Sequence, residues 1–228
     1  MKLKRSSPRE LARPTPATLA VSALGPWRDR QDLGAALREH APRLLLGGCE
    51  LFDLDTRFRH DVSSEPTPRG FVITCHDREP SAATAREMQR ATTALARAGA
   101  TEVSVHNSGL THPAATWRRL GDSGELADLY SAYVRFVAGP DLFASCGMHA
   151  FGLPDVEIAP RIDLADASNA IAAFNLYVLE RRPLLATGHW FTWKDNGPRF
   201  RLRRRESRQF KPGQPLHNPF GVWEFHAH

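Results

Sequence analysis

Apolar and polar residues follow one another along the chain in the two periods that mark secondary structure. Alternation of apolar and polar positions indicates strands, whereas apolar positions three or four residues apart indicate helices. On this basis strands are expected at 18–24, 44–52, 71–75, 101–106, 155–158, 184–193, 200–206 and 220–225, and helices at 29–40, 81–99, 114–120, 126–137 and 163–180. Strands and helices therefore alternate early in the chain, and strands dominate its end.

The strand–helix–strand run over 71–106 is the best-defined part of this pattern. Ser81 is placed to cap its helix, and Gly99 to end it. Near the other end of the chain, the tripeptide Asp-Asn-Gly at 195–197 is typical of a turn between antiparallel strands. We therefore predict an α+β fold with a mixed or antiparallel sheet and helices on one face. Two split β-α-β units side by side, closed by a C-terminal β-hairpin, would satisfy this order of elements.

The composition is that of an ordinary globular protein with a surplus of basic residues. Of the 228 residues, 42% are hydrophobic and 24% are charged, which is enough apolar material for a substantial core. We expect one α+β domain over 17–228, preceded by a flexible basic tail over 1–16. The net charge of +5 permits an acidic partner, although an arginine-rich composition also arises from a GC-rich genome.

The number and spacing of the cysteines, and the lack of long apolar stretches, indicate the cellular compartment in which the protein is expected. The three cysteines, Cys49, Cys75 and Cys146, are widely spaced, which is compatible with a reducing environment. No apolar stretch typical of a signal peptide follows the basic N-terminus, and no window approaches the about 20 apolar residues of a membrane span. The sequence thus predicts a cytoplasmic protein with no membrane partner.

The segment at 147–158 is the most distinctive motif in the chain. Three of its apolar side chains should be buried: Phe151, Val156 and Ile158. Asp155 and Glu157 alternate with these residues, so they should share the opposite face of a strand, about 7 Å apart. A carboxylate pair at that spacing suits acid–base chemistry or cation binding, but ordinary solvent-facing strand residues show the same pattern.

Four segments together resemble a bacterial family described as a domain of unknown function, number four-two-six-one. The segments are the helix, strand and loop at 81–113, the motif at 147–158, the helix around 175–179 and the strand at 184–193. The resemblance covers roughly residues 70–193. It implies a cytoplasmic bacterial protein, sometimes encoded near toxin–immunity or secretion-system genes, and no established activity. The family tends to have Asp where this chain has Thr187, which argues against a shared polar site there.

A small Cys/His or metal-dependent hydrolase is one function class to consider. A thiolate nucleophile needs an imidazole beside it, and the candidate pairs combine Cys75 or Cys146 with His106 or His149. Adjacent residues on a strand point to opposite faces, so Cys75 cannot use the histidine that follows it. The Cys-x-x-His run that begins at Cys146 is half of a zinc spacing without its second half. We therefore predict neither a metal nor a cofactor.

Four arginines alternate along the strand near the C-terminus, so their side chains should share one face: Arg199, Arg201, Arg203 and Arg205. The sequence supplies only two acids nearby, so we expect this face to be exposed and unpaired. Lys194 extends the basic surface, and Trp193 supplies an aromatic flank. Such a face suits an acidic protein partner. It also suits a nucleic-acid backbone, but exposed aromatic residues between the arginines are lacking.

These features favour a non-enzymatic cytoplasmic binding protein, an immunity or accessory factor of a toxin or secretion system, that acts through its basic, aromatic-flanked surface. The hydrolase and the nucleic-acid backbone binder stay as alternatives. Metal analysis of the purified protein separates the hydrolase from the others. A steep fall of affinity with salt identifies the nucleic-acid binder.

Overall fold

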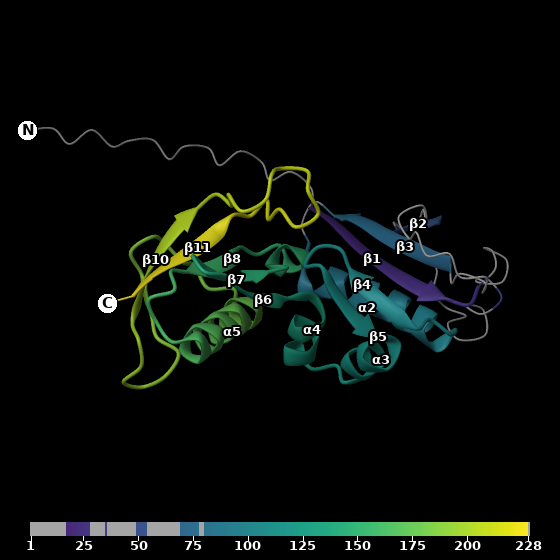
Figure 1. Ribbon diagram of the computed structural model, residues 1–228, viewed down its shortest axis with the longest axis horizontal. Helices are drawn as coiled ribbons and strands as arrows, with labels where there is room; N and C mark the ends of the chain where they lie inside the picture. Colours follow the sequence, from purple (N-terminus) through teal and green to yellow (C-terminus); the bar gives the residue numbers. More distant parts are fainter. Residues whose placement is uncertain (1–16, 28–34, 36–48, 54–68, 78–79, 228) are drawn as a thin grey trace, which may run out of the picture.

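The computed structural model of the protein describes residues 17–27, 35, 49–53, 69–77 and 80–227, and it shows an α+β fold. Two sheets lie side by side, and the helices lie on one side of them (Figure 1). The fold class predicted from the sequence is therefore confirmed. The predicted tail at 1–16 and the predicted helix at 29–40 lie outside the described residues, apart from residue 35.

The first sheet is a split β-α-β unit with two added strands, in the order β2-β3-β1-β4-β5. Its elements are β1 (Ala17–Gly25), β2 (Cys49–Asp53), β3 (Arg69–Asp77), α2 (Ala82–Arg97), β4 (Glu102–Val105) and β5 (Leu110–Pro113). The chain passes from β3 through α2 to β4, and β1 lies between these strands, antiparallel to both. Ser81 begins α2 as predicted, because its hydroxyl accepts a hydrogen bond from the Thr84 amide at 3.3 Å.

The second sheet has the order β6-β7-β8-β11-β10-β9. Its strands are β6 (Arg135–Ala138), β7 (Phe143–Cys146), β8 (Asp155–Ile158), β9 (Trp190–Phe191), β10 (Phe200–Arg205) and β11 (Val222–Ala227). Helix α5 (Leu164–Arg181) carries the chain from β8 to β9 across one face of the sheet. The last strand, β11, is inserted between β8 and β10, parallel to the first and antiparallel to the second. None of the described helices is long and apolar enough to cross a membrane.

The structure departs from the predicted elements in the middle of the chain. The predicted helix at 126–137 ends early, as α4 (Leu126–Tyr133), because the β-branched Val134 adopts extended backbone angles. The residues that follow form β6, which pairs with β7 across a turn closed by the Gly139 amide and the Leu142 carbonyl, 2.9 Å apart. The predicted strand at 184–193 is reduced to β9. Gly188 precedes β9 with a φ of 100°, which breaks the extended conformation.

A chain of aromatic contacts joins the helices to the motif at 147–158. Trp117 of α3 (Ala114–Asp122) contacts Tyr133 with 5.7 Å between ring centroids, and Tyr133 contacts Phe151 at 5.8 Å. Phe151, Val156 and Ile158 are at most 1% exposed, as predicted. The hydrophobic core runs continuously through these residues from the first sheet to the second. The motif therefore lies at the junction of the two sheets.

Candidate functional site

The arginine-rich strand is β10, and its side chains divide between the two faces of the second sheet. Phe200 and Leu202 are buried on the face that packs toward α5, whereas Arg201 and Arg203 are exposed on the opposite face. Arg205 follows the same alternation but is only partly exposed. Alternation in the sequence therefore predicts correctly which residues of this strand share a face.

Two of these arginines are paired with carboxylates, so the expectation of an unpaired face is wrong for them. Arg203 donates a hydrogen bond from Nε to Oε2 of Glu224 at 2.7 Å. Arg205 forms an ion pair with Glu157, and its Nε lies 3.6 Å from Oε2 of Glu224. Glu224 belongs to β11 and Glu157 to β8, and the sheet register places them side by side. Acids distant in sequence therefore neutralise this part of the face.

Lys194 and Trp193 also make contacts within the fold. The Lys194 ammonium lies 2.8 Å from a carboxylate oxygen of Asp166, near the start of α5. It also lies over the Trp193 ring, 4.4 Å from its centroid. Trp193 itself is only partly exposed and packs against the core. These two residues tie the turn before β10 to α5, so they add little to an exposed basic surface.

Arg199, Arg201 and Trp190 form the exposed part of the predicted surface, which we call the basic edge. The Arg199 guanidinium lies over the Trp190 ring, 5.5 Å from its centroid, and Trp190 pairs with Arg201 across β9 and β10. Trp190 is 49% exposed. Within the described part of the chain, no carboxylate is within ion-pair distance of Arg199 or Arg201. The basic edge therefore has two exposed guanidinium groups without a carboxylate partner among the described residues, next to the half-exposed Trp190 ring.

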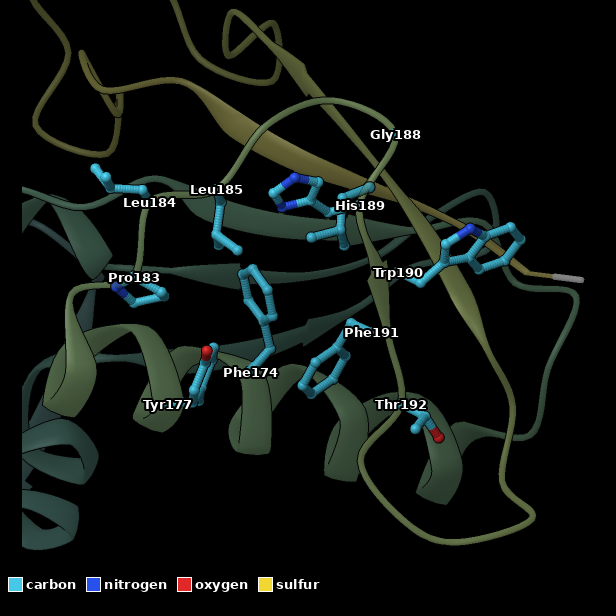
Figure 2. A pocket seen from close by; sticks show the side chains of 11 residues that line it. Phe174, Tyr177, Pro183, Leu184, Leu185, Gly188, His189, Trp190, Phe191 and Thr192 are labelled. Atoms are coloured by element: carbon cyan, nitrogen blue, oxygen red, sulfur yellow. The ribbon is translucent and has the colours of Figure 1, made fainter.

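An apolar groove of about 780 Å³ opens on the α5 face of the second sheet, opposite the face that carries the basic edge, between α5 and the loop at 183–189 (Figure 2). Phe174 and Tyr177 project into it from α5, and Leu185 and Phe191 face them. Tyr177 continues the apolar spacing of α5, but its side chain is 42% exposed. Among the described residues, β9 and the loop at 183–189 lie over this part of α5.

Hydrogen bonds fix the loop that forms the upper wall of the groove. The Gly188 amide donates to the Leu202 carbonyl, and the Leu202 amide donates to the His189 carbonyl, both at 2.8 Å. The Thr187 hydroxyl accepts a hydrogen bond from the Arg204 amide at 3.0 Å. Thr187 therefore holds the loop against β10. The groove is bounded by hydrogen-bonded backbone on one side and by a helix on the other.

Asp155 is buried and not solvent-facing, because the segment at 206–221, which we call the strap, covers its face of β8. Oδ1 accepts hydrogen bonds from the Ser145 hydroxyl and the Met148 amide, both at 3.1 Å, and Oδ2 accepts one from the Asn218 side chain at 2.7 Å. Burial nevertheless raises the pKa of Asp155 to about 6.

Glu157 is also buried, at 3% exposure, and its pKa is raised by burial although Arg205 opposes the shift. Beside these two carboxylates lies a cavity of about 10 Å³, lined in part by the strap. This space is too small for a substrate. The carboxylate pair is therefore part of the packing between β8 and the strap.

The loops that carry the predicted Cys/His pairs lie close together, and Asn107 contacts both Cys146 and His149. The Cys146 thiol contacts the Asn107 carbonyl at 3.7 Å, and Nε2 of His149 lies 2.9 Å from Nδ2 of Asn107 and 3.1 Å from the carbonyl of Pro215 in the strap. His106 instead contacts the Ser22 hydroxyl at 2.9 Å. Among the described residues, no hydrogen bond joins His106 to either Cys146 or His149.

Burial keeps both groups uncharged at neutral pH. It raises the pKa of Cys146 to about 12 and lowers the pKa of His149 to about 4. A protonated thiol and a neutral imidazole enclosed by the strap do not form an activated nucleophile. The side chain of the other candidate, Cys75, lies outside the described residues. In the described part of the chain, no group of three or more His, Cys, Asp or Glu side chains is arranged to hold a metal ion.

Sequence reasoning missed the groove and the two asparagines that organise the buried polar groups. Asn107 links His149 and Cys146, and Asn218 bridges Asp155 and the Leu153 carbonyl. Asn218 precedes a proline, which indicates a turn but does not reveal which carboxylate its amide reaches. The groove depends on where a loop folds over α5, which no local pattern specifies.

No family model matches the chain, and comparison with curated proteins and with solved structures finds no significant similarity. The functional proposal therefore rests on the geometry of the site.

Proposed function

We propose that the protein is a non-enzymatic binding protein that takes an acidic protein partner on its basic edge. The observation that carries this proposal is the pair of exposed guanidinium groups, Arg199 and Arg201, that flank the exposed Trp190 ring. Arg and Trp are the side chains that most often dominate binding energy at protein interfaces. Cations that lack carboxylate partners in the described chain also speed association with an acidic surface.

The alternatives have less support in the geometry. A hydrolase would need an activated nucleophile, whereas the Cys146 thiol and the His149 imidazole are buried and uncharged. A nucleic-acid backbone binder would need a row of free cations, whereas Arg203 and Arg205 are engaged by Glu224 and Glu157. The family resemblance over residues 70–193 is the only support for a toxin or secretion-system component as the partner.

Site-specific photo-crosslinking tests the proposal in the cells that express the protein. A photoreactive benzoylphenylalanine replaces Trp190 in one variant and Arg118 of α3 in a control. Both positions are exposed, but Arg118 belongs to α3, which packs against β4 and β5 of the first sheet. We expect a discrete covalent adduct from position 190 only, and mass spectrometry should identify it as an acidic protein. The adduct should disappear when Arg199→Glu and Arg201→Glu are added.

Two outcomes would contradict the proposal. A nucleic-acid adduct at position 190, removed by nuclease treatment, would support the backbone-binding alternative. The same set of adducts from positions 190 and 118 would mean that the basic edge has no preferred partner.

A further inference from the structure

We infer that His226 is a third cationic group of the surface that binds the acidic partner, and that its side chain takes up a proton when this partner binds. The inference rests on the proposed function and adds to it a dependence of binding on pH. Affinity for the partner should rise as the solution becomes mildly acidic.

His226 lies on the last strand, directly opposite a residue of the basic edge. The register of the second sheet pairs His226 of β11 with Arg201 of β10, and it pairs Arg201 with Trp190 of β9. Paired residues on antiparallel strands point to the same face, with Cβ atoms about 4.5–5.5 Å apart. The preceding residue, Phe225, is buried against Phe174 of α5, so the His226 side chain points away from that helix.

Trp190, Arg201 and His226 therefore form one row across three strands, on the face that α5 does not cover. The His226 side chain is 47% exposed, so solvent and a partner both reach it. A segment bound along the basic edge would cross this row. Its carboxylates would lie near the imidazole as well as near the guanidinium groups.

The charged groups on this face leave the imidazole short of negative charge in the free protein. Nε2 of His226 lies 3.4 Å from Oε2 of Glu224, but Arg203 donates a hydrogen bond to the same oxygen at 2.7 Å. The other carboxylate on this face, Glu157, forms an ion pair with Arg205. The charged groups around the imidazole are Arg201 and Arg203 of β10, Glu224 of β11, Glu157 of β8 and Arg161 in the segment that follows β8.

A bound partner changes this balance. Carboxylates placed on the basic edge favour the protonated form of a nearby imidazole. A group that holds its proton more tightly in the complex adds affinity at low pH, and this gain is lost as the pH rises through the range where the group titrates. Histidine changes charge between about pH 5 and pH 8, whereas arginine stays charged and carboxylates stay ionised there. His226 is therefore the group in this row that couples binding to pH.

An acidic probe tests the inference while the partner is still unidentified. A rhodamine-labelled peptide of ten aspartates is titrated with the full-length chain at pH 6 and pH 8, at about 20 mM ionic strength, where surface charges are weakly screened. Fluorescence anisotropy gives the affinity. Calorimetry at pH 7, in buffers with different ionisation enthalpies, gives the number of protons taken up on binding.

Four variants accompany the wild type. His226→Gln removes the titrating group, and His226→Arg makes its charge permanent. His189→Gln is the matched control, because His189 is exposed on the same edge of the sheet but precedes Trp190, so its side chain lies on the other face. Arg199→Glu/Arg201→Glu reverses the basic edge itself.

We expect the wild type to bind the peptide about threefold more tightly at pH 6 than at pH 8, the size of one exposed charge pair. It should take up protons at pH 7. His226→Gln should show the same affinity at both pH values and lose most of the proton uptake. His226→Arg should keep the tighter affinity at both, and His189→Gln should behave as the wild type.

The other outcomes separate the inference from the proposed function. An affinity that does not change with pH in the wild type, or that changes equally in His226→Gln, would overturn the inference and leave the proposed function standing, provided that the arginine reversals abolish binding. Loss of the pH dependence in His189→Gln would also overturn the inference. Binding that is insensitive to the arginine reversals, or no binding by the wild type, would overturn both.

Discussion

Ionisation of two buried side chains, Asp155 and His149, should change the unfolding free energy of this fold with pH in opposite directions. The folded-state pKa of Asp155 is about 6, above the value of 3.8 for an exposed carboxyl. Its contribution to stability is therefore present below pH 3.8 and is lost as the pH rises through about 6. The folded-state pKa of His149 is about 4, below the ordinary 6.5. Its contribution is present above pH 6.5 and is lost as the pH falls through about 4.

Each shift corresponds to about 3 kcal/mol of unfolding free energy, at about 1.4 kcal/mol for each pKa unit. The two effects nearly cancel in the wild type, so single variants are needed to reveal them. The unfolding free energy of the wild type minus that of Asp155→Asn should fall by about 3 kcal/mol from pH 3 to pH 7. The corresponding difference for His149→Gln should rise by about 3 kcal/mol over the same range.

Urea titrations at several pH values, followed by tryptophan fluorescence, measure these differences. Changes in hydrogen bonding caused by the substitutions shift each difference by a constant, so only the slope with pH matters. A flat difference for Asp155→Asn would show that burial does not perturb this carboxyl. A rising difference would show that its hydrogen bonds to Ser145, Met148 and Asn218 outweigh the loss of hydration, and would refute the reasoning.

Two further substitutions test the core and the ion pairs. Phe151→Ala removes a fully buried ring in contact with Tyr133, so it should cost about 3–5 kcal/mol in chemical denaturation; a loss below about 1 kcal/mol would contradict the burial. Arg205→Ala leaves the buried Glu157 without its ion pair and should destabilise the fold by about 3 kcal/mol, whereas Arg201→Ala should change stability by less than about 0.5 kcal/mol. Equal melting temperatures for the two arginine variants would argue against the pairing.

The sequence predicts those parts of the fold whose signals are local. The cap at Ser81, the apolar stripe that follows it and the alternation in β10 each lie within a few residues, and the structure has them where expected. The β6–β7 pair was missed, because Val137 continues the apolar spacing of the preceding helix. Val134 ends that helix, and backbone pairing with β7 then decides the structure of the residues beyond it.

The candidate site was predicted less well, because its chemistry depends on distant segments. The face that carries Asp155 and Glu157 has the pattern of a solvent-facing surface, and it is buried only because the strap folds over it. Arg203 and Arg205 have few acids near them in sequence, and their partners arrive from β11 and β8. Local periodicity predicts which face of a strand a side chain occupies, but it does not predict which distant segment will contact that face.

The most direct test of the account is the affinity of the partner captured at position 190 for two charge-matched double variants. Arg199→Glu/Arg201→Glu reverses the basic edge, and Arg118→Glu/Arg208→Glu makes the same change in net charge at exposed arginines elsewhere. We predict that surface plasmon resonance will show at least about a tenfold loss of affinity for the first and less than about a twofold change for the second. Equal losses would mean that only net charge matters, and no loss in the first variant would show that the basic edge is not the binding surface.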